Sequence, residues 1–169
     1  MKMVEAIPGF RDVGVVDGEP VYMFKKIQLL AMDLHKRFSE SRPELFYFHD
    51  IDELTIFSDN VIPTMLYHLG IITLSVDSDT TPRQVEIIQG LQEDLRTGRE
   101  TTVERSYIFR AAAVDACEAM VQKAREKTDL APFITSMTAE QIDAYLWQIA
   151  KKGPTRQVTR FCDPNTVYF

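Results

Sequence analysis

Apolar residues recur at steps of three and four along most of the chain, the spacing that places them on one face of a helix. Residues 24–42, 101–127 and 138–153 show this pattern over their whole length. Shorter helices are predicted from Pro63 to Gly70 and from Thr81 to Gly90. Proline suits the first turn of a helix and glycine its C-terminal end, so these residues set the expected bounds.

Three of the predicted helices begin with the spacing of a capping box. In this motif a small polar side chain and a carboxylate or amide three residues later bond each other's backbone. The pairs are Asp50 and Glu53, Thr101 and Glu104, and Thr138 and Gln141. We therefore expect a helix to begin at each of these positions.

Near the N-terminus the pattern changes to that of a β-hairpin. Val13, Val15 and Val16 precede the turn dipeptide Asp17-Gly18, and an extended pattern resumes at residues 21–22. Pro20 restricts the second strand to the edge of a sheet. The predicted fold is therefore mainly α, a single helical domain over residues 1–169 with a small N-terminal β-hairpin.

Composition narrows the class of protein. The chain has 169 residues, 45% of them apolar and 26% charged, which is typical of a soluble domain whose core needs no disulfides. Its only cysteines, Cys117 and Cys162, cannot form a disulfide framework or a metal site, and they indicate a reducing compartment, the cytoplasm. The net charge of −6 argues against direct polynucleotide binding. The longest uncharged run, residues 60–76, is too short to span a membrane.

Established catalytic motifs are missing from the sequence. It contains no glycine-rich dinucleotide or phosphate loop, no zinc-protease motif and no nucleophile elbow. The three histidines, His35, His49 and His68, lack the spacing of metal ligands. We therefore expect neither a metal nor a cofactor.

One carboxylate stands out by its position. Asp59 ends a stretch that mixes acidic and aromatic residues, just before the apolar helix that Pro63 enters. It could be a catalytic carboxylate, or it could cap that helix, although three positions separate it from the proline. The residues alone favour the structural interpretation.

Several segments resemble the queuosine salvage protein family. Residues 54–63, LTIFSDNVIP, are similar to the family segment LTMFADYRVP, and residues 24–33 are similar to FYKRAQILVAD. Phe109-Arg110 resembles the start of a family helix, and residues 142–147, IDAYLW, resemble LDYYLW. Residues 7–12 and the aromatic C-terminus, residues 166–169, agree as well. The matches keep their order over nearly the whole chain.

The resemblance implies a function and a fold. Family members are queuosine 5′-phosphate N-glycosylases (hydrolases), which release queuine for salvage into tRNA modification. Their fold is mostly helical and resembles helix-hairpin-helix DNA glycosylases. The family's catalytic aspartate corresponds to Asp59, and the expected partner is a small nucleotide substrate.

The aligned residues around Asp59 each have a functional and a structural interpretation. Lys25 could hold the 5′-phosphate or be a solvated lysine at a helix start. Trp147 could stack on the base or anchor the core. Asp143 could contact the ligand or assist the helix N-terminus near Thr138. The remaining substrate-binding candidates are Gln28, which could equally be a surface residue, and Arg110, which could equally be the buried ion-pair partner of Glu118 or another acidic residue.

Departures from the family pattern keep a second function open. Asn60-Val61 replaces the family's Tyr-Arg, Gln148 replaces a carboxylate, and residues 157–165 lack the expected basic residues. Losing charge-assisted contacts weakens binding by roughly 1.5–3 kcal/mol each. The chain also matches only the C-terminal half of the family, which predicts self-association or a partner over the uncovered face.

Three hypotheses follow for the function. The chain is a nucleoside 5′-phosphate N-glycosylase, or a catalytically degenerate helical domain that binds a nucleotide or protein partner, or a general helical interaction domain. The third accounts for none of the family matches.

Overall fold

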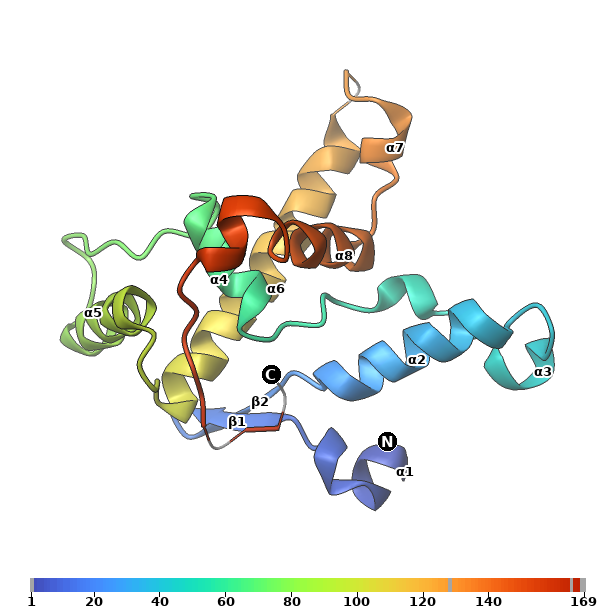
Figure 1. Ribbon diagram of the computed structural model, residues 1–169, viewed down its shortest axis with the longest axis horizontal. Coiled ribbons are helices and arrows are strands. Elements are labelled where there is room, and N and C mark those ends of the chain that lie inside the picture. Colours follow the sequence, from blue (N-terminus) through green and yellow to red (C-terminus); the bar gives the residue numbers. More distant parts are fainter. Residues whose placement is uncertain (1, 128, 165, 168–169) are drawn as a thin grey trace.

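The computed structural model describes residues 2–127, 129–164 and 166–167. Tyr168 and Phe169, which belong to the aromatic C-terminus noted above, lie outside them. The described chain is mainly helical with one two-stranded antiparallel sheet, as predicted (Figure 1). Its helices are α1 Lys2–Ala6, α2 Lys25–Phe38, α3 Pro43–Phe46, α4 Val61–His68, α5 Pro82–Thr97, α6 Val103–Glu126, α7 Pro132–Thr135 and α8 Ala139–Ile149. Short 3₁₀ turns are η1 Pro8–Phe10, η2 Ile51–Glu53 and η3 Gly153–Gln157.

The long helix α6 is the centre of the fold (Figure 1). Helices α4 and α8 pack against it, and its N-terminal part lies against strand β1. Alanine and cysteine at positions 113 and 117 allow the close approach of these helices, and they form a core with Ile62, Leu66 and Leu146. Burial of such apolar side chains supplies the main stabilisation of the fold. No helix among the described residues is long and apolar enough to cross a membrane.

The predicted hairpin is present. Strand β1, Val13–Val16, pairs antiparallel with β2, Glu19–Tyr22. Asp17 and Gly18 form the turn, and both have positive φ angles, 52° and 84°. Such angles are typical of the two-residue turns that match the twist of a hairpin.

Gly14 in β1 lies directly against the aromatic ring of Tyr107 in α6. A Cβ atom at this position would overlap the ring carbons, so the strand or the ring must move. We expect Gly14→Ala to lower the free energy of unfolding by about 1–3 kcal/mol, the usual cost of overpacking. Urea unfolding measures this loss.

The matched control is Gly9→Ala, because a Cβ at Gly9 meets no atom within 4 Å. Equal stability of the two variants would show that the hairpin does not depend on this close contact with α6.

Local signals predicted some helix ends correctly and others incorrectly. The capping box of Thr138 and Gln141 is confirmed at the start of α8. Asp50 makes no side-chain cap, and only the short turn η2 follows it. Helix α6 begins one residue later than predicted, with Thr102 accepting from the amide of Arg105. Helix α5 continues through Gly90 to Thr97, where Gly98 adopts the left-handed conformation that ends a helix.

Candidate functional site

Asp59 lies in the segment that connects η2 to α4, and its side chain is only 7% exposed. Its Oδ1 accepts hydrogen bonds from the amides of Val61 at 2.6 Å and Ile62 at 3.4 Å. Helix α4 begins two residues before Pro63, so the carboxylate reaches its first amides. The N-cap residue of α4 is Asn60, and the Asp59 carboxylate, one residue earlier, bonds the first two amides of the helix. This structural role leaves the second oxygen of Asp59 for a chemical one.

That second oxygen forms an ion pair with Lys25. The distance from Lys25 Nζ to Asp59 Oδ2 is 3.1 Å, and the lysine side chain is 15% exposed. Lys25 is the first residue of α2, so the pair joins α2 to the start of α4. Low exposure keeps water from screening the pair, which makes the attraction stronger than at an open surface.

Asp143 brings a second buried carboxyl group toward this pair. It lies in the first half of α8, and its Oδ2 accepts a hydrogen bond of 2.8 Å from the amide of Phe57. Burial is the main cause that raises the pKa of Asp143 from 3.8 to about 6. The charges of Asp59 and Glu140 act in the same direction, and the hydrogen bond from Phe57 and the charge of Lys25 act against it. Asp143 therefore exchanges its proton near neutral pH, within the electrostatic field of the Lys25–Asp59 pair.

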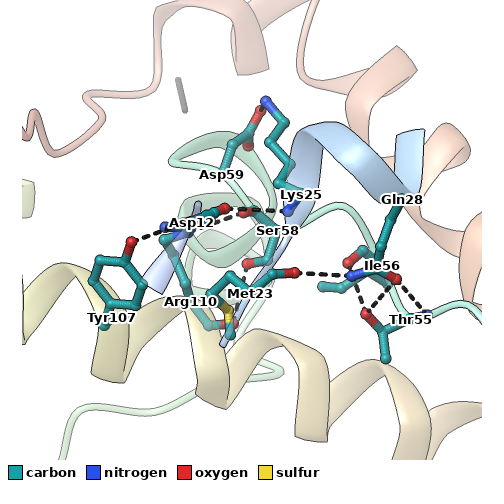
Figure 2. Close-up of polar contacts among 10 residues, drawn as sticks. All are labelled: Asp12, Met23, Lys25, Gln28, Thr55, Ile56, Ser58, Asp59, Tyr107 and Arg110. Carbon is teal, nitrogen blue, oxygen red and sulfur yellow. Dashed lines mark hydrogen bonds and ion pairs between the residues drawn. The ribbon is translucent and has the colours of Figure 1, made fainter. Parts of the chain in front are cut away.

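Gln28 connects α2 to the segment that carries Asp59. Its Nε2 donates to the carbonyl of Met23 at 2.8 Å, and its Oε1 accepts from the amide and the hydroxyl of Thr55, both at 3.2 Å (Figure 2). Both ends of the side chain are thus bonded within the protein, so Gln28 fixes the position of residues 54–56 relative to α2.

Arg110 is completely buried in α6 and forms an ion pair with Asp12. Its Nη1 and Nη2 donate to the two carboxylate oxygens at 2.9 and 2.5 Å, and its Nε donates to the carbonyl of Ser58 at 2.9 Å. Figure 2 shows Asp12 next to the backbone of Lys25, with Arg110 and Tyr107 below the Lys25–Asp59 pair. The buried ion pair predicted for Arg110 is present, and its acidic partner is Asp12.

Trp147 lies on α8 one turn after Asp143, and its side chain is 47% exposed. The ammonium of Lys151 sits 4.5 Å from the centre of its ring. The interpretation of Trp147 as a core anchor is therefore wrong. The apolar face of α8 that enters the core consists of Ile142 and Leu146 instead.

Sequence reasoning missed Asp12 as a residue that supports the site. Asp12 is fully buried and binds partners 13, 95 and 98 residues away in the chain. No local spacing marks such a residue, because every side chain that it contacts comes from a distant segment. Two signals were available: Asp12 ends the segment of residues 7–12 that is similar to the family, and a buried ion pair was one interpretation of Arg110.

The larger surface depressions of the described chain lie away from this group. One of about 850 Å³ lies between the hairpin and the start of α6, and two of about 550 and 490 Å³ lie along α5. Asp59, Lys25 and Asp143 line none of these three. A smaller depression of about 200 Å³ lies between α2 and the start of α8, where Leu54 and Glu140 are among its lining residues. The side chain of Asp59 is buried, with the ammonium of Lys25 against it.

The described residues hold no cluster of metal-binding side chains, and the buried thiol of Cys117 is unreactive. No three histidine, cysteine or acidic side chains among them come together to hold a metal ion. Burial raises the pKa of the Cys117 thiol to about 12, so it stays protonated and unreactive. The chemistry of the site therefore rests on two carboxyl groups and one ammonium group.

Comparison with known proteins identifies the relatives of this chain. The family model described as queuosine salvage protein matches residues 1–169. A queuosine 5′-phosphate N-glycosylase/hydrolase from Sphaerobacter thermophilus is 31% identical over 153 residues, which cover 90% of this chain and 41% of the relative. The proteins of the same name from Schizosaccharomyces pombe and Nematostella vectensis are 30% and 27% identical, covering 86% and 95% of this chain and 36% and 45% of the relatives. This chain spans about two fifths of the length of the curated relatives it matches.

Proposed function

We propose that this chain, which belongs to the queuosine salvage protein family, hydrolyses the N-glycosidic bond of queuosine 5′-phosphate or a similar nucleotide. The products are the free base, queuine, which returns to tRNA modification, and a sugar phosphate. The observation that carries the proposal is the buried Asp59 carboxylate, paired with Lys25 and within the field of Asp143.

The proposed chemistry follows from the charge that develops on the sugar. Breaking the bond between C1′ and the base nitrogen leaves positive charge on the ribose, which a fixed carboxylate stabilises. We assign this role to Asp59. Water supplies the hydroxyl group at C1′, and its proton balances the one that the leaving base takes up.

Asp143 suits the proton transfer. A carboxyl group with a pKa of about 6 is partly protonated near neutral pH, whereas an ordinary aspartate is not. Two carboxyl groups in different environments can then divide the work, one remaining charged while the other carries a proton. A 7-deaza base lacks the ring nitrogen that purine-cleaving enzymes often protonate, so the leaving nitrogen needs such a donor.

Lys25 is proposed to bind the 5′-phosphate. A phosphate dianion attracts an ammonium group more strongly than a single carboxylate does, so the incoming substrate would compete with Asp59 for Lys25. This exchange would uncover Asp59 Oδ2, which the lysine holds at 3.1 Å in the absence of substrate. The half-exposed Trp147 is proposed to stack on the base, and Gln28 and Arg110 to support the substrate site through their internal bonds.

The proposal extends to the arrangement of the helices, the extent of the domain, the compartment and a partner surface. We propose that the helices are arranged as in helix-hairpin-helix DNA glycosylases, that the chain is one domain matching the C-terminal half of the family, and that it works in the cytoplasm. We also propose that a second copy or another polypeptide covers part of the surface. Exposed apolar side chains such as those of Leu29 and Tyr145 support a contact of this kind, and sedimentation of the purified chain tests for self-association.

A second function is favoured by one specific observation. Both carboxylate oxygens of Asp59 are bonded within the protein, and the larger depressions lie elsewhere. A catalytically degenerate domain that binds a nucleotide or a protein partner would have this arrangement permanently rather than only before substrate binds.

The test compares turnover with binding. The purified chain is incubated in excess over queuosine 5′-phosphate, and free queuine is measured by chromatography and mass spectrometry. The full-length Sphaerobacter thermophilus relative serves as the positive control. We expect queuine release by this chain. Calorimetric binding of the nucleotide without release would support the degenerate domain and refute the hydrolase.

A further inference from the structure

We infer that Asp12 is a positioning residue that sets the geometry of the Lys25–Asp59 ion pair through Arg110 and the backbone of residues 23–25. This inference rests on the proposed function only for its catalytic consequence. The positioning itself is carried by contacts among four segments of the chain, residues 12, 23–25, 58–59 and 107–110, and can be tested without substrate.

The first link runs from Asp12 to Lys25. The amide of Lys25 donates to Asp12 Oδ2 at 3.1 Å, and the carbonyl of Asp12 accepts from the amides of Met23 at 3.0 Å and Phe24 at 3.4 Å. Asp12 therefore holds three consecutive residues at the start of α2. Since Lys25 is the first residue of that helix, its side chain is aimed by the same bonds.

The backbone at this point adopts a conformation that needs support. Phe24 has a φ angle of +49°, in the left-handed region that bulky side chains rarely adopt. Such a conformation persists only where the surroundings impose it. The bonds from Asp12 on both sides of Phe24 supply that constraint, and the resulting sharp turn directs α2 away from the hairpin.

The second link runs from Arg110 to Asp59. Arg110 Nε donates to the carbonyl of Ser58 at 2.9 Å, and the hydroxyl of Ser58 donates to the carbonyl of Arg110 at 3.0 Å. These reciprocal bonds fix Ser58 to α6. Asp59 is the next residue, so its backbone position is set by the same pair of bonds.

The ion pair of Asp12 with Arg110 joins the two links. Tyr107 adds a hydrogen bond of 2.8 Å from its hydroxyl to Asp12 Oδ1, and its ring lies against the Arg110 guanidinium, 4.9 Å away. Burial and the bond to Asp12 raise the pKa of Tyr107, so its hydroxyl remains a donor. Asp12 thus bonds the backbone of Lys25 directly, and its partner Arg110 bonds the residue before Asp59. The same buried group therefore supports both members of the Lys25–Asp59 ion pair (Figure 2).

A positioning role of Asp12 and a purely stabilising role predict different pKa values for Asp143 when Asp12 is replaced. Lys25 lowers the pKa of Asp143, while burial, Asp59 and Glu140 raise it. If the support from Asp12 is lost and Lys25 moves away, its lowering effect weakens and the pKa of Asp143 rises further. A variant that only destabilises the fold leaves this titration unchanged while the protein remains folded.

The experiment measures that titration by carbon-detected NMR of the side-chain carboxyl groups in the whole chain. Asp12→Asn is compared with Asp94→Asn, which breaks another low-exposure ion pair, Asp94 with Arg105 at 3.0 Å between α5 and α6. We expect the pKa of Asp143 to rise by about 0.5–1 unit in Asp12→Asn, a size typical of a displaced opposite charge, and to stay unchanged in Asp94→Asn.

Tyr107→Phe is the second variant, because it keeps the ion pair and removes only one bond to Asp12. We expect a smaller rise in the pKa of Asp143. If Asp12→Asn does not fold, the Asp143 titration of Tyr107→Phe tests the inference alone. An unchanged Asp143 titration in the folded variants would overturn the inference. Queuine release by the wild type is measured in parallel, so that a failed hydrolase proposal and a failed positioning proposal give different results.

Discussion

Asp59→Asn is expected to lower kcat for queuosine 5′-phosphate hydrolysis by about 10³-fold, corresponding to roughly 4 kcal/mol of transition-state stabilisation. The substitution removes the negative charge that would face the developing cation. It keeps an oxygen that can accept from the amides of Val61 and Ile62, and asparagine caps helices about as well as aspartate. Rapid-quench turnover measurements at saturating substrate give the ratio.

The same substitution leaves the ammonium of Lys25 without its carboxylate. Loss of a charge-assisted bond at a part-buried position costs about 1–3 kcal/mol. The double variant Asp59→Asn with Lys25→Met is therefore expected to recover most of the lost stability but none of the activity. Because Lys25 is itself the proposed phosphate-binding residue, the double variant reports on stability alone, and the kcat of Asp59→Asn reports on the chemical role of the carboxylate.

Asp94→Asn is the matched control for this prediction as well. Asp94 is a buried aspartate with an arginine partner, and it lies on α5, away from Lys25 and Asp143. It is expected to reduce stability without changing kcat. Retention of more than about a tenth of the wild-type kcat by Asp59→Asn would contradict the catalytic assignment.

Asp143→Asn is expected to affect stability and activity in opposite directions. The pKa of Asp143 is about 6 in the folded chain and 3.8 in the reference state, so the folded chain binds more protons between these values. Stability from the protonated carboxyl group is fully present below about pH 4 and is lost as the pH rises through 6. At pH 7.5 the buried group is charged, at a cost of roughly 3 kcal/mol.

The amide side chain avoids this cost and still offers an oxygen to the amide of Phe57. We therefore expect Asp143→Asn to be more stable than the wild type by up to about 3 kcal/mol above pH 7, with the difference shrinking toward zero near pH 4. Denaturant unfolding at several pH values measures the difference. Asp115→Asn, at an exposed position of α6, is the control and is expected to change stability little at any pH.

Activity is expected to fall in the same variant, because the proton that Asp143 exchanges near pH 6 is lost. The wild-type profile of kcat/KM against pH should contain a titration near 6 that is missing in Asp143→Asn. A stability difference that does not depend on pH, or an unchanged pH profile, would remove Asp143 from the proposed proton transfer.

Much of the architecture could be predicted because helices and hairpins depend on residues close together in the chain. The periodicity of residues 24–38, the turn at Asp17-Gly18 and the capping box at Thr138 all reappear in the structure. The predictions failed where packing outweighed a local signal. Gly90 does not end α5, because the helix continues through Leu91 and Leu95, which are buried in the core.

The candidate site, like the fold, was predicted from the sequence only in part. Asp59 and Lys25 were identified from segments that resemble the family, but nothing local indicated that they would pair with each other across 34 residues. Trp147 follows an apolar residue on an amphipathic helix, yet it is half-exposed because Ile142 and Leu146 occupy the core side of α8.

The sequence by itself determined the helical class, the hairpin and the family, and it indicated Asp59 as the candidate catalytic carboxylate. These depend on spacings of a few residues and on short segments in order. Only the tertiary structure decided that Asp12 binds Arg110, 98 residues away, and that Asp143 meets the amide of Phe57, 86 residues away. Burial and charge proximity, which set the pKa of Asp143, arise only when distant segments exclude water together, so no local pattern encodes them.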